Sequence, residues 1–506
     1  MAQMKTPGVY IVEMNAFPSS IVEVATAVPA FIGYTEKAVN ENKSLLQKPW
    51  RITSMAEYHT YFGSAPTPMF ELTNLTSAKK AGGAPDFSFN GNDYRLEQNA
   101  GKFLLYYSLM LFYANGGGAC YIVSVGDYTS TIQPDVLTSG IDLLKKEQEP
   151  TLVVIPDAVL LSNEDCIAVQ QIMLKHCGEE MKNRFSILDI YDGYKDRNDP
   201  SGNVIDNFRD SLGINFMDFG AVYYPWVNTV IVQPSDLSYL NISNKDELQA
   251  QLLGDLGLAT LPENATAVQK KLAAEITNIS NDDLPEIEKV ILDKTLTASS
   301  KLYKSIIKEV KNKINLMPPS GAIAGIYTMV DNTRGVWKAP ANVSLNYVVS
   351  PAVSITSEGQ EDLNVTLQGK SVNAIRSFTG EGTLVWGART LDGNSQDWKY
   401  VNVRRTMIML EESIRIASKK YVFEPNDSNT WVKMKSMITN FLTDIWKRGG
   451  LAGSKPEQAF IVQVGLGETM TPNDILDGIL RITVLVAISH PAEFIEITFQ
   501  QKMQES

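Results

Sequence analysis

Few residues of this chain have the types and spacing that catalysis or metal binding requires. The chain has three histidines, His59, His176 and His490. None stands in the HExxH arrangement that places two imidazoles on one helix face around zinc. His176 precedes Cys177, but neighbouring residues on a helix point about 100° apart, so these two side chains cannot pair there.

Nucleophile and phosphate motifs are equally weak. Ser320 stands in "PPSGA", but no GxSxG elbow is present and nothing nominates a base. The run "NGGGA" at 115–119 lacks the Gly-Lys-Ser/Thr ending and follows a predicted helix, whereas a phosphate loop precedes one. Its glycines are better interpreted as a turn from helix to strand. In "DRNDPSG" at 196–202, Pro200 stands where a calcium ligand belongs. We therefore expect no enzyme activity, no cofactor and no metal.

The cysteines and the overall charge narrow the class of protein further. The widely spaced Cys120, Cys166 and Cys177 form no CxxC pair, which indicates packed, reduced thiols in a cytosolic chain. The net charge of −12 argues against a surface for nucleic acid or anionic lipid. The longest apolar run, 482–488, is too short to span a bilayer, and the first residues do not form a secretion signal. We expect synthesis in the cytoplasm, no nucleic-acid partner and no direct membrane insertion.

The first half of the chain alternates strand and helix patterns. A capping box at Ser54 and Glu57 begins a short helix. Further helices are predicted at 102–114, 163–182 and 205–212, and strands at 21–27, 30–34, 120–125, 152–155, 185–190 and 219–224. This spacing predicts an α/β domain with a mainly parallel sheet.

Two segments interrupt this pattern, and the last part of the chain differs from it. Residues 64–100 are rich in Pro, Gly, Asn and Ser, so we predict exposed loops there. Lys/Glu-rich patterns at 236–316 predict a helical insertion. Beyond it the sequence predicts strands at 323–327, 384–386, 459–464 and 483–488, and amphipathic helices at 406–421 and 430–447. This suits a C-terminal α+β domain, and no repeat of 20 to 50 residues is visible.

Both chain ends carry an alternating, β-rich segment. The first comprises Val9, Tyr10, Ile11, Val12 and Glu13, and the last Phe494, Ile495, Glu496, Ile497, Thr498 and Phe499. Chain ends usually fray, so each predicted strand needs a pairing partner, within its own subunit or in a neighbour. Pro18-Ser19-Ser20 and Ser489-His490-Pro491 stand beside these segments and suit pivots.

"MPPSGAIAGIYTMVDNTRGVWKAPAN" at 317–342 is the most distinctive stretch. It resembles the core signature of contractile tail sheath proteins of phages and phage-like contractile injection systems. "TPGVYIVE", "FYANGGGACYIVSV", "VVIPD", "YYPW", "GTLVWGARTL", "WKYVNVRRT", "VFEPNDSNTW" and "PAEFIEITF" follow the family's order. The resemblance covers the chain except for roughly 64–100 and 236–316. It implies a non-enzymatic subunit of a sheath that polymerises around an inner tube and contracts to drive the tube through a target membrane.

The resemblance also implies a domain division and a role for the arms. The chain would then consist of an N-terminal arm and linker at 1–20, a middle domain at 21–390, an inner C-terminal domain at 391–488 and a C-terminal arm at 489–506. The arms of neighbouring copies add strands to another subunit's C-terminal sheet. The family's partners are further copies, the inner tube, baseplate and cap or terminator proteins, and a disassembly ATPase. The sequence does not distinguish a phage from a secretion apparatus or a released particle.

We predict specific roles for several charged and aromatic residues. Residues 392–448 hold ten Lys/Arg and seven Asp/Glu, a local +3. Lys433 and Lys435, on a predicted helix, would therefore suit contact with an acidic tube, or a solvated helix face. In the signature we interpret Asp331, Arg334, Gly335, Trp337 and Lys338 as supports of the fold, with Trp337 anchoring a domain junction and Arg334 pairing with Asp331. A further group of arginines could lie at contacts between subunits: Arg389, Arg404 and Arg405.

Two other classes of protein remain as alternatives. A tail-tube, baseplate or shell protein would be structural too, but tube proteins are far shorter, mostly β, and lack the 317–342 signature. An α/β hydrolase or nucleotide-binding enzyme would be active as a monomer and would not need residues 1–16 or 491–506.

Overall fold

The computed structural model describes residues 21–76, 84–261, 264–366 and 369–496. Its chain forms two compact units. The α/β unit comprises residues 27–333 and 339–401, and the described part of the C-terminal unit comprises 21–26, 334–338 and 402–496. The backbone therefore passes between the units after Thr26, Thr333, Lys338 and Val401. The predicted boundaries at 20/21 and 390/391 lie 6 and 11 residues before the first and last of these crossings.

A nine-stranded sheet forms the centre of the α/β unit in the described residues, in the order β14-β17-β16-β11-β10-β9-β1-β8-β4. The strands are β1 Pro29–Thr35, β4 Trp50–Ile52, β8 Cys120–Asp127, β9 Leu152–Val154, β10 Phe185–Asp189, β11 Gly220–Tyr224, β14 Val343–Ser344, β16 Asn373–Phe378 and β17 Gly382–Val385. The run from β16 to β8 is parallel, whereas β4, β17 and β14 pair antiparallel at the two edges. This agrees with the predicted mainly parallel sheet.

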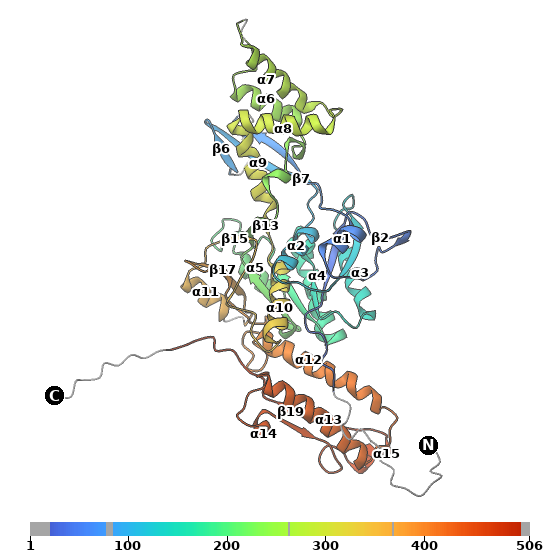
Figure 1. The fold of residues 1–506 in the computed structure, drawn as a ribbon. Helices are drawn as coiled ribbons and strands as arrows, with labels where there is room; N and C mark the ends of the chain where they lie inside the picture. The colour runs from blue at the N-terminus through green and yellow to red at the C-terminus, as the bar shows by residue number, and fades with distance from the viewer. Residues whose placement is uncertain (1–20, 77–83, 262–263, 367–368, 497–506) are drawn as a thin grey trace, which may run out of the picture. The chain divides into compact units, whose positions relative to one another are not determined.

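Helices cover both faces of this sheet (Figure 1). The helices of the unit outside the insertion are α1 Met55–Phe62, α2 Leu105–Ala114, α3 Pro134–Leu143, α4 Asn163–Lys175, α5 Val204–Ser211, α10 Ser320–Arg334 and α11 Ser357–Asn364. Phe31 of β1 contacts Phe112 of α2 with ring centroids 5.2 Å apart. Ile32 points to the other face, where it would be touched by a Cβ added at Gly140 of α3. Alternate residues of the buried strand β1 thus pack against helices on opposite faces of the sheet.

Helices α2 and α10 pack so closely that their backbones nearly touch. A Cβ added at Gly321 would lie 2.4 Å from the carbonyl oxygen of Ser108, and one at Gly325 would lie 2.5 Å from that of Phe112. Only glycine fits at these two positions, which explains "SGAIAG" in the signature. The prediction of a strand at 323–327 is wrong, because these residues lie inside α10. A short run of apolar residues fits a buried helix as well as a strand.

Buried carboxylates hold the first turns of both helices. Asp157 accepts hydrogen bonds from the backbone N–H of Leu104 (2.6 Å) and of Tyr34 (3.1 Å). Asp189, at the end of β10, accepts from the N–H of Ser320 at 3.0 Å. Burial raises the pKa of Asp189 to about 7 and that of Asp157 to about 6, although the hydrogen bonds oppose the shift.

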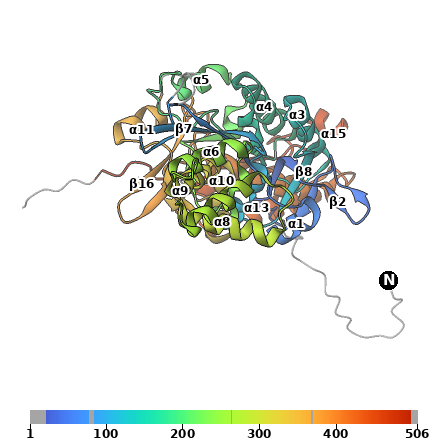
Figure 2. The ribbon, with the colours of Figure 1, turned by 90° about the horizontal axis from the view of Figure 1, so that it is seen from above.

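The segments 64–100 and 236–316 fold together into one body, which we call the insertion lobe. Its strands are β5 Met69–Asn74, β6 Phe87–Phe89 and β7 Asn92–Ala100, in the antiparallel order β5-β7-β6. Its helices are α6 Lys245–Asp255, α7 Ala267–Thr277, α8 Glu286–Ser299 and α9 Lys301–Ile314 (Figure 1). Figure 2 shows α6, α8 and α9 from above. The helical insertion is as predicted, but the prediction of exposed loops at 64–100 is wrong.

Side-chain amides join the two segments of the lobe. The amide of Asn244 accepts from the N–H of Leu72 at 2.9 Å and donates to its carbonyl oxygen at 2.7 Å, as a neighbouring strand would. Gln251 accepts from both Asn74 and Tyr94. These contacts span more than 150 residues, so the local turn-rich composition of 64–100 did not reveal them.

Short strands complete the α/β unit. A small sheet has the order β13-β12-β15, and β2 pairs with β3 in a hairpin. These strands are β2 Val39–Asn40, β3 Lys43–Ser44, β12 Val227–Thr229, β13 Leu316–Met317 and β15 Val348–Pro351.

Candidate assembly interface of the C-terminal unit

Two layers build the C-terminal unit. Its elements are α12 Val401–Ser418, which begins at the last residue of the α/β unit, α13 Ser428–Lys447, α14 Pro456–Ala459, α15 Pro472–Leu476, β18 Phe460–Gln463 and β19 Thr483–Val486. Asp427 caps α13 by accepting from the N–H of Thr430 at 2.9 Å. The buried stripe of α13 includes Met434, Ile438 and Phe441, and α13 packs against β18. This agrees with the predicted α+β character.

The sheet of this unit has only two strands in the described part of the chain, so each strand has an open edge. Phe460 and Val462 of β18 are buried on the inner face. Ile461 of β18 lies directly opposite Leu485 of β19 on the outer face. These two side chains are 47% and 53% exposed. A two-stranded sheet with an apolar outer face and open edges is incomplete by itself.

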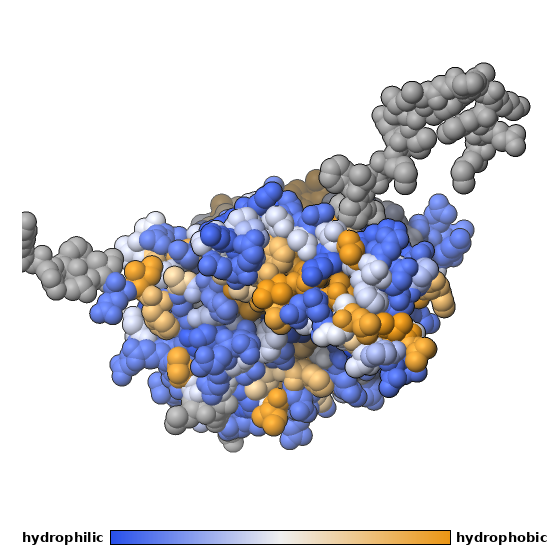
Figure 3. Space-filling view, turned by 90° about the horizontal axis from the view of Figure 1, so that it is seen from below, coloured by the Kyte–Doolittle hydropathy of each residue, from blue (hydrophilic) through white to orange (hydrophobic). Residues whose placement is uncertain are grey.

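The sequence predicted both strands, but it did not reveal that Ile461 and Leu485 lie opposite each other on the outer face. A signal was present, because Phe460, Ile461 and Val462 are apolar in succession, as are Val484, Leu485 and Val486. In a short strand, such a run places apolar residues on both faces. The view from below shows apolar side chains at the surface among polar ones (Figure 3).

The chain that follows the predicted N-terminal arm is fixed to the C-terminal unit. The N–H of Val24 donates to Ser413 of α12 at 3.1 Å, and Arg405 donates to the carbonyl oxygen of Thr26 at 2.9 Å. Glu23 forms an ion pair with Arg448 at 2.6 Å. The prediction of a strand at 21–27 is wrong, because no strand forms there. The arm residues Val9 to Glu13 and the linker 18–20 lie outside the described residues.

The base of the predicted C-terminal arm is held on the same unit. Ser489 donates its N–H to the carbonyl oxygen of Gly450 and its hydroxyl to that of Gly449, at 3.4 and 3.2 Å. Asn402 donates to the carbonyl oxygen of Ser489 at 3.2 Å. A pivot of this arm therefore has to begin after Ser489 rather than at it.

The described part of the C-terminal arm makes no strand in the single chain. Phe494 and Ile495 are 75% and 79% exposed, and Glu496 is exposed as well. These three residues have no regular secondary structure in the single chain. The strand predicted from 494, which was expected to pair with a neighbouring copy, stays a prediction. Ile497, Thr498 and Phe499 lie outside the described residues.

Trp337 is the central residue of the signature loop. It is only 4% exposed, and the guanidinium carbon of Arg448 lies 4.8 Å from the centre of its ring. Asn402 donates to its carbonyl oxygen at 2.9 Å. Gly335 has φ +92°, and a Cβ added there would lie 2.5 Å from the Trp337 ring, so glycine is required.

The charged residues of the signature lie at or near the surface. Arg334 and Lys338 are exposed, and Asp331 is half-buried. Arg334 thus lies at the solvent-exposed end of α10, and its pairing with Asp331 stays a prediction.

Lys433 and Lys435 are both exposed on α13, as predicted, but they do not form one strip. Residues two apart on a helix point about 160° from each other. The buried residue Met434 stands between them, so the two lysines flank the packed stripe on opposite sides. One flat partner surface cannot contact both.

The arginines considered for contacts between subunits are internal. Arg389, Arg404 and Arg405 are 5%, 8% and 4% exposed. Arg389 donates to the carbonyl oxygen of Asn364 at 2.9 Å. These side chains support the fold of their own chain, and burial leaves them no surface for a neighbour.

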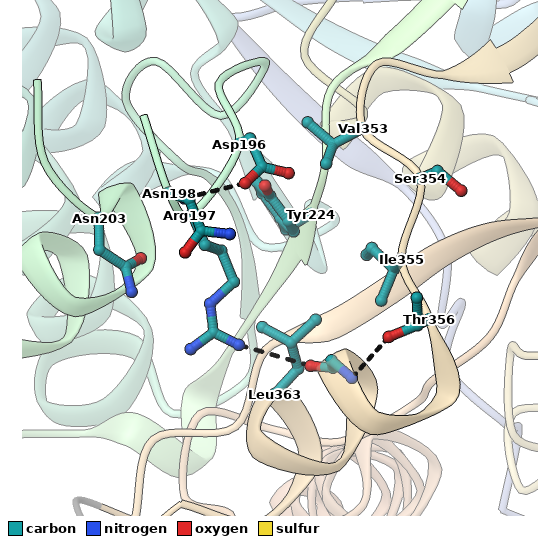
Figure 4. Close-up of a pocket in the computed structure, with 11 residues that line it drawn as sticks. Asp196, Arg197, Asn198, Asn203, Tyr224, Val353, Ser354, Ile355, Thr356 and Leu363 are labelled. Atoms are coloured by element: carbon teal, nitrogen blue, oxygen red, sulfur yellow. Dashed lines mark hydrogen bonds between the residues drawn. The ribbon is translucent and has the colours of Figure 1, made fainter. Parts of the chain in front are cut away.

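A hollow of about 350 Å³ lies near the carboxyl end of β11 in the α/β unit (Figure 4). Several of its polar groups have partners in the chain. Arg197 donates to Asp362 at 2.6 Å, Asn203 caps α5, and Tyr224 donates to the carbonyl oxygen of Lys195 at 2.8 Å. No nucleophile and base meet among these lining residues.

The three cysteines and His176 are internal, whereas His59 and His490 are exposed. Cys120, Cys166 and Cys177 are free and buried, and burial raises the pKa of each thiol to about 12. His176 is buried beside Arg184, and its pKa falls to about 4 through desolvation and that positive charge. Among the described residues no cluster of His, Cys, Asp and Glu could hold a metal ion. None of the described helices is long and apolar enough to cross a bilayer.

Comparison with known proteins gives a consistent result along the chain. A family model of the phage tail sheath C-terminal domain matches residues 394–502. The tail sheath protein of Vibrio phage KVP40 is 26% identical over 178 residues, which are 35% of this chain and 25% of that protein. The tail sheath protein of Burkholderia phage BcepMu is 24% identical over 242 residues, 46% of this chain and 48% of that protein. The matched segments thus span a quarter to about half of these relatives.

Solved structures match over nearly the full length. The chain is similar to one in the baseplate of the anti-feeding prophage, at 28% identity and a TM-score of 0.59, over 99% of this chain and 100% of that one. It is similar to a chain of the PVC sheath complex of an extracellular contractile injection system in the contracted state, at 27% identity and a TM-score of 0.58, over 99% of both chains. The helical sheath of the anti-feeding prophage in the contracted state matches at 26% identity and a TM-score of 0.59, over 99% of this chain and 100% of that one.

Proposed function

We propose that this chain, which is similar to contractile tail sheath proteins, is a structural subunit of such a sheath and not an enzyme. It polymerises with further copies of itself around an inner tube and contracts to drive the tube through a target membrane. The observation that carries this proposal is the incomplete β18-β19 sheet, because it is located on the unit from which both predicted arms leave.

Strand addition links neighbouring copies. The arms, Val9 to Glu13 and Phe494 to Phe499, add to the open edges of β18 and β19 in another subunit. The added strands satisfy edge N–H and C=O groups and cover the apolar face around Ile461 and Leu485. The exposure of Phe494 and Ile495 supports this role, because apolar side chains at a chain end need a partner to cover them.

The placement of both arm bases suits contraction. Val24 and Ser489 each hydrogen-bond within the C-terminal unit, so every proposed link joins one C-terminal unit to another. The α/β unit carries none of these attachment points. It can therefore change its packing against neighbours while the linked inner units stay connected.

Tube contact is assigned to the exposed flanks of α13. Because Lys433 and Lys435 point to opposite sides, one of them, and not both, faces an acidic tube. Such an exposed charge contact is weak and sensitive to salt, which suits release of the tube. Baseplate and cap or terminator proteins bind the two ends of the polymer, and a disassembly ATPase recycles it after assembly in the bacterial cytoplasm.

Negative-stain microscopy of the purified full chain tests the proposal. The expected result is long striated cylinders whose formation depends on protein concentration. Discrete particles at every concentration, together with a hydrolytic or nucleotide-dependent activity, would instead support the enzyme alternative. Short closed shells without cylinders would support the other structural class.

A further inference from the structure

Residues 21–26, which we call the strap, connect the predicted N-terminal arm to the α/β unit and belong to the C-terminal unit. None of them lies in a helix or strand, and Ile21 is buried. The strap is held through Glu23, Val24 and Thr26, which contact side chains of α12 and of the end of α13. A segment held by separate side-chain contacts opens locally at a lower cost than a strand in a ladder.

The base of the C-terminal arm is built differently, because it continues the backbone pairing of β19. Ala487 donates its N–H to the carbonyl oxygen of Ala459 and accepts from the N–H of Ala452, at 2.8 and 2.7 Å. Ile488 forms an antiparallel bridge with Leu451. Backbone partners on both sides hold this base in place. The strap is therefore the arm base that detaches more easily.

Arg448 joins the strap to the signature loop. One of its guanidinium nitrogens contacts Glu23 at 2.6 Å and Asp444 at 3.5 Å, and the guanidinium carbon lies 4.8 Å from the centre of the Trp337 ring. The side chains of Arg448 and Glu23 are 45% and 30% exposed, so their ion pair is weak and sensitive to salt. Because one guanidinium makes all these contacts, a shift of Arg448 together with Trp337 separates it from Glu23.

Detachment of the strap lengthens the link between copies. The chain is fixed again just beyond the strap, where Val28 donates to the hydroxyl of Thr151 at 2.9 Å and accepts from its N–H at 2.8 Å. An extended chain spans about 3.3 Å per residue, so release of 23–26 adds roughly 13 Å to the reach of the arm. The attachment of the N-terminal arm then moves from the C-terminal unit to Val28 in the α/β unit.

Resting on the proposed sheath function, we propose that the ion pair of Glu23 with Arg448 is a latch, which keeps the strap on the C-terminal unit before contraction and opens during it. While the latch is closed, the N-terminal link has a fixed length. Once it opens, the longer link lets neighbouring copies move while the added strands stay paired. Movement of the signature loop opens the latch, because Trp337 and Glu23 contact the same guanidinium.

A cross-link that holds the strap in place tests this latch. Glu23→Cys and Asp444→Cys place two thiols beside Arg448, where both native carboxylates contact the same nitrogen. The full chain is assembled around purified inner tube protein, and the cylinders are then treated with a short bismaleimide, so that folding and assembly precede the link. The native thiols are buried and do not compete. Asn440→Cys with Asp444→Cys, two exposed positions four residues apart on α13, provides the control link.

Gentle heating is expected to shorten the control cylinders, whereas cylinders with a linked strap lose this shortening in negative-stain microscopy. Mass spectrometry confirms that the links lie within one chain. In chains without a cross-link, Glu23→Gln should raise the rate of shortening about threefold at low salt, and the rate should no longer depend on salt. Strap-linked cylinders that shorten like the control overturn the latch and leave the proposed function intact. Wild-type chains that form no cylinders, or cylinders that never shorten, overturn both.

Discussion

Ile461 and Leu485 face each other across the β18-β19 pair, and each is exposed to about half of its surface. Phe460 and Val462 of β18 are buried on the inner face, where α13 packs, and Val484 and Val486 of β19 are half-buried, so the sheet is packed on one side and open on the other. This relationship separates folding from assembly. Substitutions on the inner face act on stability, and substitutions on the outer face act on association.

Ile461→Asp is expected to prevent cylinder formation while the chain stays folded. A charge on the outer face opposes the covering strands, but an exposed side chain changes the free energy of unfolding by only about 0.5 kcal/mol. Val462→Ala is the matched control, because this buried neighbour loses core contacts and costs about 1–3 kcal/mol. Sedimentation and circular dichroism measure both properties. Normal cylinders from Ile461→Asp would contradict the role of this face.

Separate charge reversals distinguish the two flanks of α13. Lys433→Glu and Lys435→Glu are expected to differ in tube co-assembly, because only one flank can face the tube. The affected variant should also lose the salt dependence of the wild-type interaction. Co-sedimentation of sheath and tube at low and high salt provides the measurement. Equal losses in both variants, or no loss in either, would exclude a tube contact through one flank of α13.

Gly321→Ala is expected to destabilise the α/β unit. The added Cβ lies 2.4 Å from a backbone oxygen of α2, so the two helices have to separate, at a cost of roughly 1–3 kcal/mol. Gly254→Ala is the control, because nothing lies within 4 Å of that position on the exposed side of α6. There alanine should stabilise the helix by about 0.5–1 kcal/mol. Urea unfolding of both variants checks the contrast, and equal effects would contradict the close packing.

The buried carboxylate of Asp189 is expected to make stability depend on pH. Burial raises its pKa to about 7 in the folded chain, above the value of about 4 in an unfolded one. The protonated form therefore favours folding, and this stabilisation is complete below about pH 4 and lost as the pH rises through about 7. Asp189→Asn keeps an oxygen for the N–H of Ser320 and removes the charge.

Urea unfolding of the wild type and of Asp189→Asn at pH 5, 6 and 8 measures this effect. The stability of the wild type relative to the variant should fall between pH 5 and 7 by up to about 1.4 kcal/mol per pH unit and then level off. A constant difference across this range would show that Asp189 does not titrate there.

The sequence predicted most of the parallel sheet, because its buried strands are short apolar runs between helices with caps. The prediction was wrong where a local pattern is compatible with two structures. Residues 323–327 fit a strand or a buried helix, and only the fit of Gly321 and Gly325 against α2 explains the helix. The sheet at 64–100 depends on Asn244 and Gln251, more than 150 residues away, which no local pattern contains.

The candidate interface could be predicted only in part, because a local pattern does not show which distant residues the folded chain brings together. The alternating pattern at 494–499 indicated a segment with an unmet pairing need, and the exposure of Phe494 agrees with that need. Periodicity did not show where the arm bases attach. The hydrogen bonds of Val24 to Ser413 and of Asn402 to Ser489 join positions that only the folded chain brings together.

The most direct test of the central claim is the assembly of a chain that lacks residues 1–20 and 491–506. Both sites where the arms attach, Glu23 to Thr26 and Ser489, remain in this chain, so its thermal unfolding should match that of the full chain. Sedimentation and negative-stain microscopy should then find monomers and no cylinders. Regular cylinders from the truncated chain, at concentrations where the full chain assembles, would contradict strand addition as the link between subunits.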